Sequence, residues 1–462
     1  MSPSSVSRID QPRYTLAILL LIIAFHVGFA AWYASVTPYR TGGVVFLNPS
    51  NEKDIGAPDE RQHVNYVAHL SQGLGFPIFK PGDPDLYETY QSHQPPLFYL
   101  IATAWSKALG IGEFESRESG LKLRALNIIL GAGTVAGVFF LGFWGLKNTE
   151  ISLAAAAFAG LLPMFVALSG AVSNDPLLML LCTWTLAVAA LCMQSGWTWP
   201  RVITLGALLG LAFLTKTTAL ALVPTLIVVL FLKSEFRPGM AKVAASVGIA
   251  LLFVAPWWAR NQSLYHDPLA IKAFSNAFKM SAQKETIVQI IQMRDPGAPA
   301  ELTYWKDWVG WFTARSFVGT FGYMDIWLNE SGTAQGRGPN TLYRFFIALI
   351  LGLLAASLVA LSRERDRLLT PVHVMNAVFF AVVALLFVRF NMQYFQAQGR
   401  YLLPAIGPIS LAIGMGAIFL AKNRPYVGIA CLALTLVGLN GYVVSRLPGE
   451  FDKRTSTYFP PR

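Results

Sequence analysis

The sequence predicts an all-α, polytopic membrane protein with about eleven transmembrane helices and short interfacial helices in its first large external loop. Of the 462 residues, 54% are hydrophobic and only 13% are charged, whereas a soluble domain carries about 25% charged residues. Apolar runs of about 20 residues recur from end to end, and a helix of that length spans the roughly 30 Å hydrocarbon core of a bilayer.

The first apolar run, Tyr14–Tyr33 (YTLAILLLIIAFHVGFAAWY), is interpreted as a retained span. It is too long for the apolar part of a secretion signal, and the following SVTPYR is a poor cleavage site. Arg8 and Arg13 precede the run and favour a cytoplasmic start, because Lys and Arg are enriched in cytoplasmic segments.

A polar stretch at 34–123 follows, and it contains the apolar segment Pro95–Gly110, which is short and interrupted by Lys107. Such a segment favours a position along the membrane interface over a full crossing. Ten further apolar runs complete the predicted spans. They begin near Arg124, Ile151, Leu177, Val202, Thr218, Val243, Tyr343, His373, Leu402 and Tyr426.

The charges of the short turns predict the orientation. With a cytoplasmic N-terminus, the cytoplasmic turns are LKNTE, WTWPR, KSEFRPGMAK, SRERDR and AKNRP, and each carries Lys or Arg. The short turns SND and QAQGRY on the other side carry one basic residue between them. This bias follows the positive-inside rule. We therefore expect a multi-pass protein of the plasma (inner) membrane whose polar loops and C-terminal tail face the extracytoplasmic side.

Cysteine usage and net charge exclude other classes. Cys182, Cys192 and Cys431 all fall in apolar runs without CxxC spacing, which argues against a disulfide framework and a thiolate metal site. The net charge of +11 follows largely from the basic turns, and part of it could serve an anionic ligand. No basic run is interleaved with aromatic residues on a soluble surface, so no nucleic-acid partner is expected.

Charge is concentrated in the first external loop at APDERQH. Pro58 favours a helix start, which would place Asp59 and Glu60 in the first turn, where the helix dipole favours negative charge. Asp59 and His63 are four residues apart and share a helix face. A carboxylate and an imidazole in this arrangement could bind a divalent cation, or the carboxylate could act as a base. The alternative is an ordinary acidic first turn.

Two further turns add polar residues on the same face. In SHQPPLFYL, His93 and Gln94 stand before a double proline that stops and orients the chain. In SNDPL, Asp175 lies at the outer end of one span, just before Pro176 opens the next. Helix capping is the alternative role of Asp175, because Ser, Asn and Asp are preferred N-caps.

Four cations lie in apolar or aromatic surroundings: Lys216, Arg260, Arg315 and Arg400. A buried cation costs several kcal/mol and is usually retained for a partner, often an anion. The alternative is that these side chains extend to the membrane surface. Carboxylates, histidines and cations thus converge on one water–lipid boundary, as needed to activate a hydroxyl while stabilising a phosphate that leaves from a lipid.

These motifs together resemble the GT-C superfamily of membrane glycosyltransferases. APDERQHVNYVAHLSQG is similar to its acidic motif in the first external loop, YQSHQPPLFYL to its Pro-Pro motif, SNDPLLMLL to its second acidic site and LAFLTKTTAL to a lysine-bearing turn. A largely uncharacterised bacterial branch also has WWARNQSLYHDPL, FVGTFGYMDI and QGRYLLP. The resemblance covers about residues 14–420.

The resemblance implies an inverting transfer of sugar from a polyprenyl-phosphate donor, such as undecaprenyl phosphate, to an acceptor glycan, lipid or protein of the cell envelope. It makes Asp59 the general base and a metal contact, Glu60 its acidic companion, and Asp175, with Gln94 and His63, part of the substrate site. In related aminoarabinose transferases, Glu-Lys precedes the Pro-Pro motif. His93 can still bind a divalent metal (Mg, Mn, Ca or Zn), but Gln94 carries no charge.

The phosphate contact is therefore expected from Arg400, Lys216, Arg260 or Arg315. The implied division of the chain is a catalytic transmembrane module at 1–270, an external loop with short helices at 271–342, and C-terminal helices with an external tail at 343–462. Two rival functions stay open: a transporter or flippase of a lipid-linked sugar, and a polymerase or ligase of lipid-linked glycans. Transporters usually contain internal repeats, and the sequence shows none.

Overall fold

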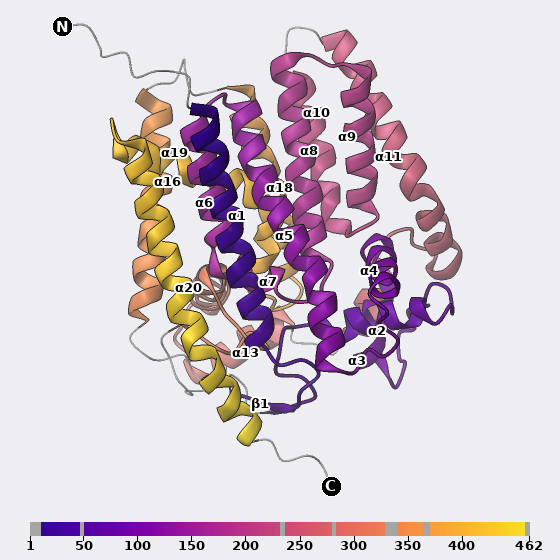
Figure 1. Ribbon diagram of the computed structural model, residues 1–462. Helices are drawn as coiled ribbons and strands as arrows, with labels where there is room; N and C mark the ends of the chain where they lie inside the picture. Colours follow the sequence, from indigo (N-terminus) through magenta and orange to yellow (C-terminus); the bar gives the residue numbers. More distant parts are fainter. Residues whose placement is uncertain are drawn as a thin grey trace, which may run out of the picture.

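Helices run through almost the whole length of the protein (Figure 1). The computed structural model describes residues 11–46, 50–231, 236–279, 283–328, 340–363 and 370–457. The expected basic turns at 233–242 and 362–367, the external loop at 271–342 and the C-terminal tail therefore lie partly outside the described residues.

Each of the eleven apolar runs is helical. The corresponding elements are α1 (Gln11–Val36), α5 (Arg117–Gly145), α6 (Thr149–Leu161) with α7 (Pro163–Ser169), α8 (Asp175–Ser195), α9 (Trp199–Phe213), η2 (Thr217–Ala221) with α10 (Leu222–Phe231), α11 (Phe236–Tyr265), α16 (Thr341–Arg363), α18 (Pro371–Asn391), η4 (Gly399–Ala405) with α19 (Ile406–Ala421), and α20 (Pro425–Ser456).

Within the described residues, eight helices are long and apolar enough to cross a membrane, and a ninth span results if α6 and α7, bent by 63°, are counted as one. Helix α9 and the helical segment at 217–229 are shorter. The all-α polytopic fold is confirmed, whereas the count of eleven spans stays a prediction.

The core of the bundle consists of α5, α6, α8 and α19. Every residue of α6 from Ile151 to Leu161 is buried, and the run Ala154–Ala157 gives it a narrow surface. A Cβ atom at Gly414 of α19 would lie only 2.8 Å from the backbone nitrogen of Ala155. Small residues thus let these helices approach closely, as is typical of membrane bundles.

The first large loop folds at the end of the bundle opposite the N-terminus (Figure 1). It contains the predicted short helices α2 (Glu60–Ser71), α3 (Leu86–Thr89), η1 (Tyr90–His93) and α4 (Leu97–Ala108). It also contains a small hairpin that the sequence did not predict, in which β1 (Gly43–Val45) pairs antiparallel with β2 (Ser50–Glu52).

The segment between α11 and α16 has a small core of its own. Its elements are α12 (Ile271–Ala277), α13 (Lys284–Arg294), α14 (Ala300–Thr303), the π-helical turn η3 (Tyr304–Gly310) and α15 (Trp311–Val318). Ile287, Ile291, Tyr304 and Val309 are buried together with Ala397, which lies just before η4. The boundaries 1–270, 271–342 and 343–462 stay predictions.

The C-terminal end of α20 packs on the first large loop and on the turn that carries Asp325. Arg454 donates from Nε to Asp325 Oδ2 at 2.8 Å and from Nη1 to Glu450 Oε2 at 3.0 Å, and its guanidinium lies 4.6 Å from the ring centre of Phe46. The C-terminal helix therefore ends on the side of the first loop, opposite the N-terminus (Figure 1), as an odd number of crossings requires.

Candidate active site

Asp59 stands at the junction of the first loop and α2. Its backbone is left-handed (φ 65°), a conformation that Asp tolerates better than most residues. The helix consequently begins at Glu60 and not at Pro58, and the Asp59 side chain does not cap it. Gly56 permits the close approach of this loop to the end of α1, because a Cβ atom there would lie 2.2 Å from the carbonyl oxygen of Pro38.

Both carboxylate oxygens of Asp59 have partners. The Tyr90 hydroxyl donates to Oδ1 at 2.5 Å, and Arg400 donates from Nη2 to Oδ2 at 2.8 Å. Burial by itself would raise the pKa of Asp59, but Arg400, the Tyr90 hydrogen bond and His63 outweigh burial and lower it to about 2. Asp59 is therefore a carboxylate at neutral pH.

Arg400 reaches Asp59 from η4, 341 positions further along the chain. Its side chain is only 6% exposed. The preceding Gly399 donates its backbone N–H to the Ser316 hydroxyl at 2.7 Å, and a Cβ atom at Gly399 would lie 2.3 Å from the Phe317 nitrogen. Helix α15 thus fixes the turn that carries Arg400.

Asp175 and Lys216 form a second ion pair. Asp175 opens α8, Lys216 precedes η2, and Nζ lies 2.5 Å from Oδ1. Asp175 also interacts electrostatically with Arg400 and His63. Asp59 and Asp175, two of the three acids that the sequence singled out, therefore lie in one charged cluster with Arg400 and Lys216, two of the four predicted cations.

His63 interacts electrostatically with all four members of the two ion pairs. Its Nδ1 is 2.9 Å from the Tyr99 hydroxyl. Burial lowers the pKa of His63 to about 3, against the opposing influence of Asp59 and Asp175. A neutral imidazole thus faces both carboxylates.

Glu60 points the other way, into a buried node with Arg124 of α5. Arg124 donates from Nε to Oε1 at 2.8 Å and from Nη2 to Oε2 at 2.5 Å. The backbone N–H of Val172 also donates to Oε1, at 2.8 Å. Arg124 further donates to the carbonyl oxygens of Ala34, Thr37 and Pro38. The node joins the end of α1, the start of α2 and the turn before Asp175.

His93 and Gln94 belong to a chain of hydrogen bonds. His93 Nδ1 lies 2.6 Å from the carbonyl oxygen of Tyr90, and its Nε2 lies 3.0 Å from the amide nitrogen of Gln94. The Gln94 carbonyl accepts from the Asn174 amide at 3.3 Å. Burial lowers the pKa of His93 to about 4, so the ring is neutral at pH 7.

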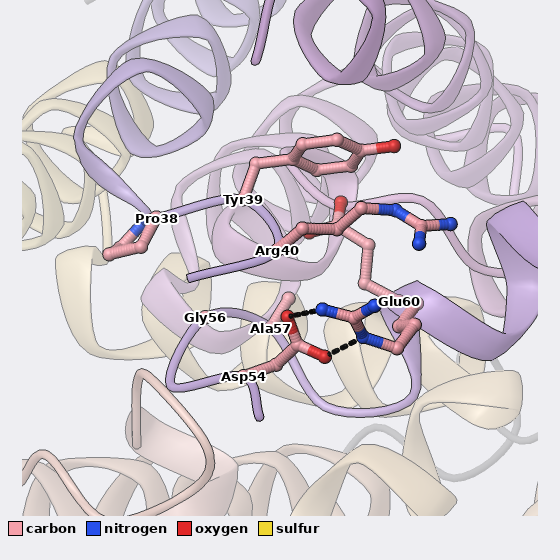
Figure 2. A pocket seen from close by; sticks show the side chains of 8 residues that line it. Pro38, Tyr39, Arg40, Asp54, Gly56, Ala57 and Glu60 are labelled. Carbon is pink, nitrogen blue, oxygen red and sulfur yellow. Dashed lines mark hydrogen bonds and ion pairs between the residues drawn. The ribbon is translucent and has the colours of Figure 1, made fainter. Parts of the chain in front are cut away.

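A small pocket lies beside Glu60 (Figure 2). Its lining includes Tyr39, Arg40 and the ion pair of Arg61 with Asp54, whose Nη2–Oδ1 distance is 3.0 Å. The lining does not include Asp59, Asp175 or Arg400. The pocket is therefore formed by the first loop alone. The ion pairs Asp59–Arg400 and Asp175–Lys216 lie outside it.

Comparisons with known proteins concern the family and the fold. Residues 93–259, less than half of the chain, match the family described as dolichyl-phosphate-mannose-protein mannosyltransferase. No curated protein sequence matches the chain. The oligosaccharyltransferase of Archaeoglobus fulgidus tethered to an acceptor peptide superposes with a TM-score of 0.57 at 12% identity, over 99% of this chain and 57% of that one.

The same archaeal enzyme, AglB, in complex with an inhibitory peptide and a dolichol-phosphate gives a TM-score of 0.56 at 13% identity, covering 95% of this chain and 56% of that one. Its complex with zinc and sulfate gives 0.55 at 12% identity, over 93% and 53%. The chain has the fold of the GT-C superfamily. It spans little more than half the length of the archaeal enzyme.

The GT-C resemblance raised the expectation of a divalent metal on Asp59 and His93. The residues do not fit one as they are arranged here. Both oxygens of Asp59 contact Tyr90 and Arg400, and both ring nitrogens of His93 have neighbours within 3.0 Å. Across the residues that the structure describes, no three His, Cys, Asp or Glu side chains are grouped as metal ligands. We therefore assign no step to a metal.

Arg260 and Arg315, the other two predicted cations, contact other parts of the protein. Arg260 of α11 donates to the carbonyl oxygen of Pro77 at 2.9 Å and lies 4.7 Å from the Trp257 ring centre. Arg315 of α15 is buried among aromatic rings, with its guanidinium 4.1 Å from Trp327 and 4.8 Å from Phe312. Their predicted phosphate contact stays a prediction, and the observed contacts favour a packing role.

Three residues of this candidate site were not predicted from the sequence: Tyr90, Arg124 and Tyr323. Burial raises the pKa of Tyr323, and the negative charge of Asp59 raises it further. Tyr90 stands only three residues before His93, so its place in the Pro-Pro motif was the available clue. Nothing in the sequence around Arg124 distinguishes it from a basic residue at a helix end.

Proposed function

We propose that the protein transfers a sugar from a polyprenyl-phosphate carrier to an acceptor hydroxyl, with Asp59 as the general base and with inversion at the anomeric carbon. The observation that carries this proposal is the adjacency of two ion pairs, Asp59–Arg400 and Asp175–Lys216. The archaeal relative of this fold has been solved with a dolichol-phosphate, which supports a carrier of that class.

In the proposed reaction, Asp59 accepts the proton of the acceptor hydroxyl while the hydroxyl oxygen bonds to the anomeric carbon. The bond from that carbon to the phosphate oxygen breaks, and its electron pair leaves with the polyprenyl phosphate. Attack opposite the leaving group inverts the configuration. Arg400 and Lys216 would bind the phosphate, and stabilisation of developing charge is often the largest catalytic contribution.

The remaining acids have supporting roles in this proposal. Asp175 orients Lys216 through their ion pair, and Glu60 fixes the start of α2 through Arg124. Glu60 was expected as a catalytic companion of Asp59, but its two oxygens already accept three hydrogen bonds from Arg124 and Val172. We therefore propose a positioning role for it.

The reaction is proposed to take place on the extracytoplasmic face of the plasma membrane. The basic turns in the sequence support this orientation, because Lys and Arg are enriched in cytoplasmic segments. Helix α2 lies at the opposite end of the bundle (Figure 1). A polyprenyl carrier would be anchored in the bilayer with its phosphate at that boundary.

The test uses the purified protein in lipid nanodiscs with labelled polyprenyl monophosphate monosaccharides and a membrane extract as the source of acceptors. The wild-type protein is expected to transfer the label. The transfer rate of Asp59→Asn is expected to be lower by at least about 10²–10⁴-fold, the usual contribution of a general base. Asn suits this comparison because it also tolerates the left-handed backbone.

Each other outcome counts against part of the proposal. Near-normal turnover of Asp59→Asn would remove Asp59 as the base. Transfer of a whole glycan from a diphosphate carrier would instead identify a polymerase or ligase. Movement of the carrier across the bilayer without bond formation would identify a transporter.

A further inference from the structure

Among the residues that the structure describes, Tyr90 is the one neutral side chain in hydrogen-bond contact with the Asp59 carboxylate. Its hydroxyl donates to Oδ1, while the charged Arg400 donates to Oδ2. A base whose negative charge is neutralised by a guanidinium is a poor proton acceptor, since an adjacent cation favours the charged form. One of the two partners therefore has to give way before Asp59 can act.

Arg400 is the partner that an anionic donor can draw away. It interacts with Asp175 as well as with Asp59, and the Asp175–Lys216 pair lies next to it. An incoming phosphate would find two cations here, and charge-assisted hydrogen bonds from guanidinium to phosphate are strong and often bidentate. Tyr90 carries no charge, so an arriving anion has no comparable effect on it.

The segment that carries Tyr90 is anchored from α2. Gln62 donates to the carbonyl oxygen of Tyr87 at 2.8 Å, and Asn65 donates to that of Glu88 at 3.0 Å. The ring of Tyr90 also meets Phe278 edge-on, with the ring centres 5.9 Å apart. These contacts fix the hydroxyl relative to α2, the helix that begins one residue after Asp59.

His93 and Gln94 anchor Tyr90 from the other side. The carbonyl oxygen of Tyr90 can only accept, so His93 carries its proton on Nδ1 and its Nε2 accepts from the Gln94 amide. The Gln94 carbonyl accepts from Asn174, the residue before Asp175. One chain of hydrogen bonds thus connects Tyr90, the partner of Asp59, to the turn that carries Asp175.

We propose that Tyr90 is a positioning residue that keeps Oδ1 of Asp59 occupied, so that the acceptor hydroxyl meets Oδ2 after the donor phosphate has drawn Arg400 away. His93 and Gln94 then serve to orient Tyr90. This inference rests on the proposed function, because it needs Asp59 to be the base. It assigns an order of events in which donor binding precedes proton transfer.

Tyr90→Phe tests the proposal with the loss of a single oxygen atom. Hydrogen bonds to charged groups are worth about 1.5–3 kcal/mol, so turnover at saturating donor is expected to fall about 10- to 100-fold. The KM for the polyprenyl monophosphate sugar is expected to stay within about twofold, because Arg400 and Lys216 are intact.

A second readout separates positioning from general damage. The charged and titratable groups that face Asp59 are Arg400, His63, Tyr90, Tyr99 and Tyr323. Only the Tyr90 contact changes in the variant, and it favours the charged carboxylate. Its loss raises the pKa of Asp59, so the acid limb of the turnover profile is expected to move to higher pH.

Tyr33→Phe is the matched control. Tyr33 of α1 is a buried tyrosine whose hydroxyl has no hydrogen-bond partner among the described residues. This variant should keep wild-type turnover and pH profile. Size-exclusion chromatography and the dissociation constant of polyprenyl monophosphate show that each variant is folded.

The outcomes distinguish the two proposals. Wild-type turnover and an unmoved acid limb in Tyr90→Phe, beside an inactive Asp59→Asn, would overturn the role of Tyr90 and leave the proposed function standing. A large rise in the donor KM of Tyr90→Phe with unchanged turnover would also overturn it. Near-normal turnover of Asp59→Asn would overturn both the role of Tyr90 and the role of Asp59 as the base.

Discussion

Arg124 and Glu60 form a buried, two-point ion pair across 64 positions of sequence, with Nε–Oε1 and Nη2–Oε2 distances of 2.8 and 2.5 Å. The two side chains are 0% and 5% exposed. Arg124 uses its remaining N–H groups on the carbonyl oxygens at the end of α1. The pair therefore fixes the residue next to Asp59 against two membrane helices.

Glu60→Ala is expected to be the most destabilising single change in this loop. Removal of one partner from a buried ion pair costs about 3–5 kcal/mol, because the other charge stays buried and unpaired. We expect a clearly lower Tm in detergent. The control is Glu118→Ala, which removes the 78%-exposed partner of the 41%-exposed Lys122; an exposed pair is worth about 0–1 kcal/mol. Equal Tm values for the two variants would contradict the structural role of Glu60.

Gly399→Ala is expected to impair donor binding without touching a charged residue. Its Cβ atom would lie 2.3 Å from the nitrogen and 2.5 Å from the Cα atom of Phe317, so the turn carrying Arg400 has to shift. We expect at least a tenfold rise in the dissociation constant of polyprenyl monophosphate. Gly438→Ala in α20 is the control, because a Cβ atom there meets nothing within 4 Å. Unaltered binding by Gly399→Ala would show that Arg400 does not need its present position.

Lys substitutions can measure how much Arg400 and Arg260 each contribute to donor binding. Arg400→Lys is expected to weaken polyprenyl monophosphate binding about tenfold or more, since Lys lacks the planar fork that matches a phosphate. Arg260→Lys is expected to change it little, because Arg260 contacts the carbonyl oxygen of Pro77 and the Trp257 ring. The reverse ranking in a direct binding assay would move the donor site towards α11.

The membrane fold was readable from the sequence because local apolar runs decide it. Each run became a helix, and the double proline in SHQPPLFYL does precede a helix, α4. The hairpin of β1 and β2 was missed because three-residue strands leave too few positions for an alternating pattern. The left-handed Asp59 was missed because Pro58 predicts a helix start two residues before the observed start at Glu60.

The site itself was only half readable. Motifs on single loops identified Asp59, Asp175, Lys216 and Arg400, yet no local pattern says that Arg400 pairs with Asp59 or Lys216 with Asp175. Such pairs depend on which helix ends meet across the bundle. The same reason explains why Glu60 was assigned to the chemistry, because its partner Arg124 lies in another helix.

The pH dependence of stability gives the last prediction, through His63. Burial lowers its pKa to about 3 in the folded protein, while an exposed histidine titrates near 6.5. Between these values the unfolded chain binds a proton that the folded protein does not, so stability rises with pH across this window and is lost as pH falls. At pH 5 the loss due to His63 is about 2 kcal/mol, at 1.36 kcal/mol per pKa unit.

We expect the Tm of His63→Gln to fall less than that of the wild type between pH 7 and 5. His69→Gln on the same helix, where the side chain is partly exposed, should follow the wild type. Parallel curves for all three proteins would mean that His63 is protonated in the folded state, contrary to the neutral ring described above.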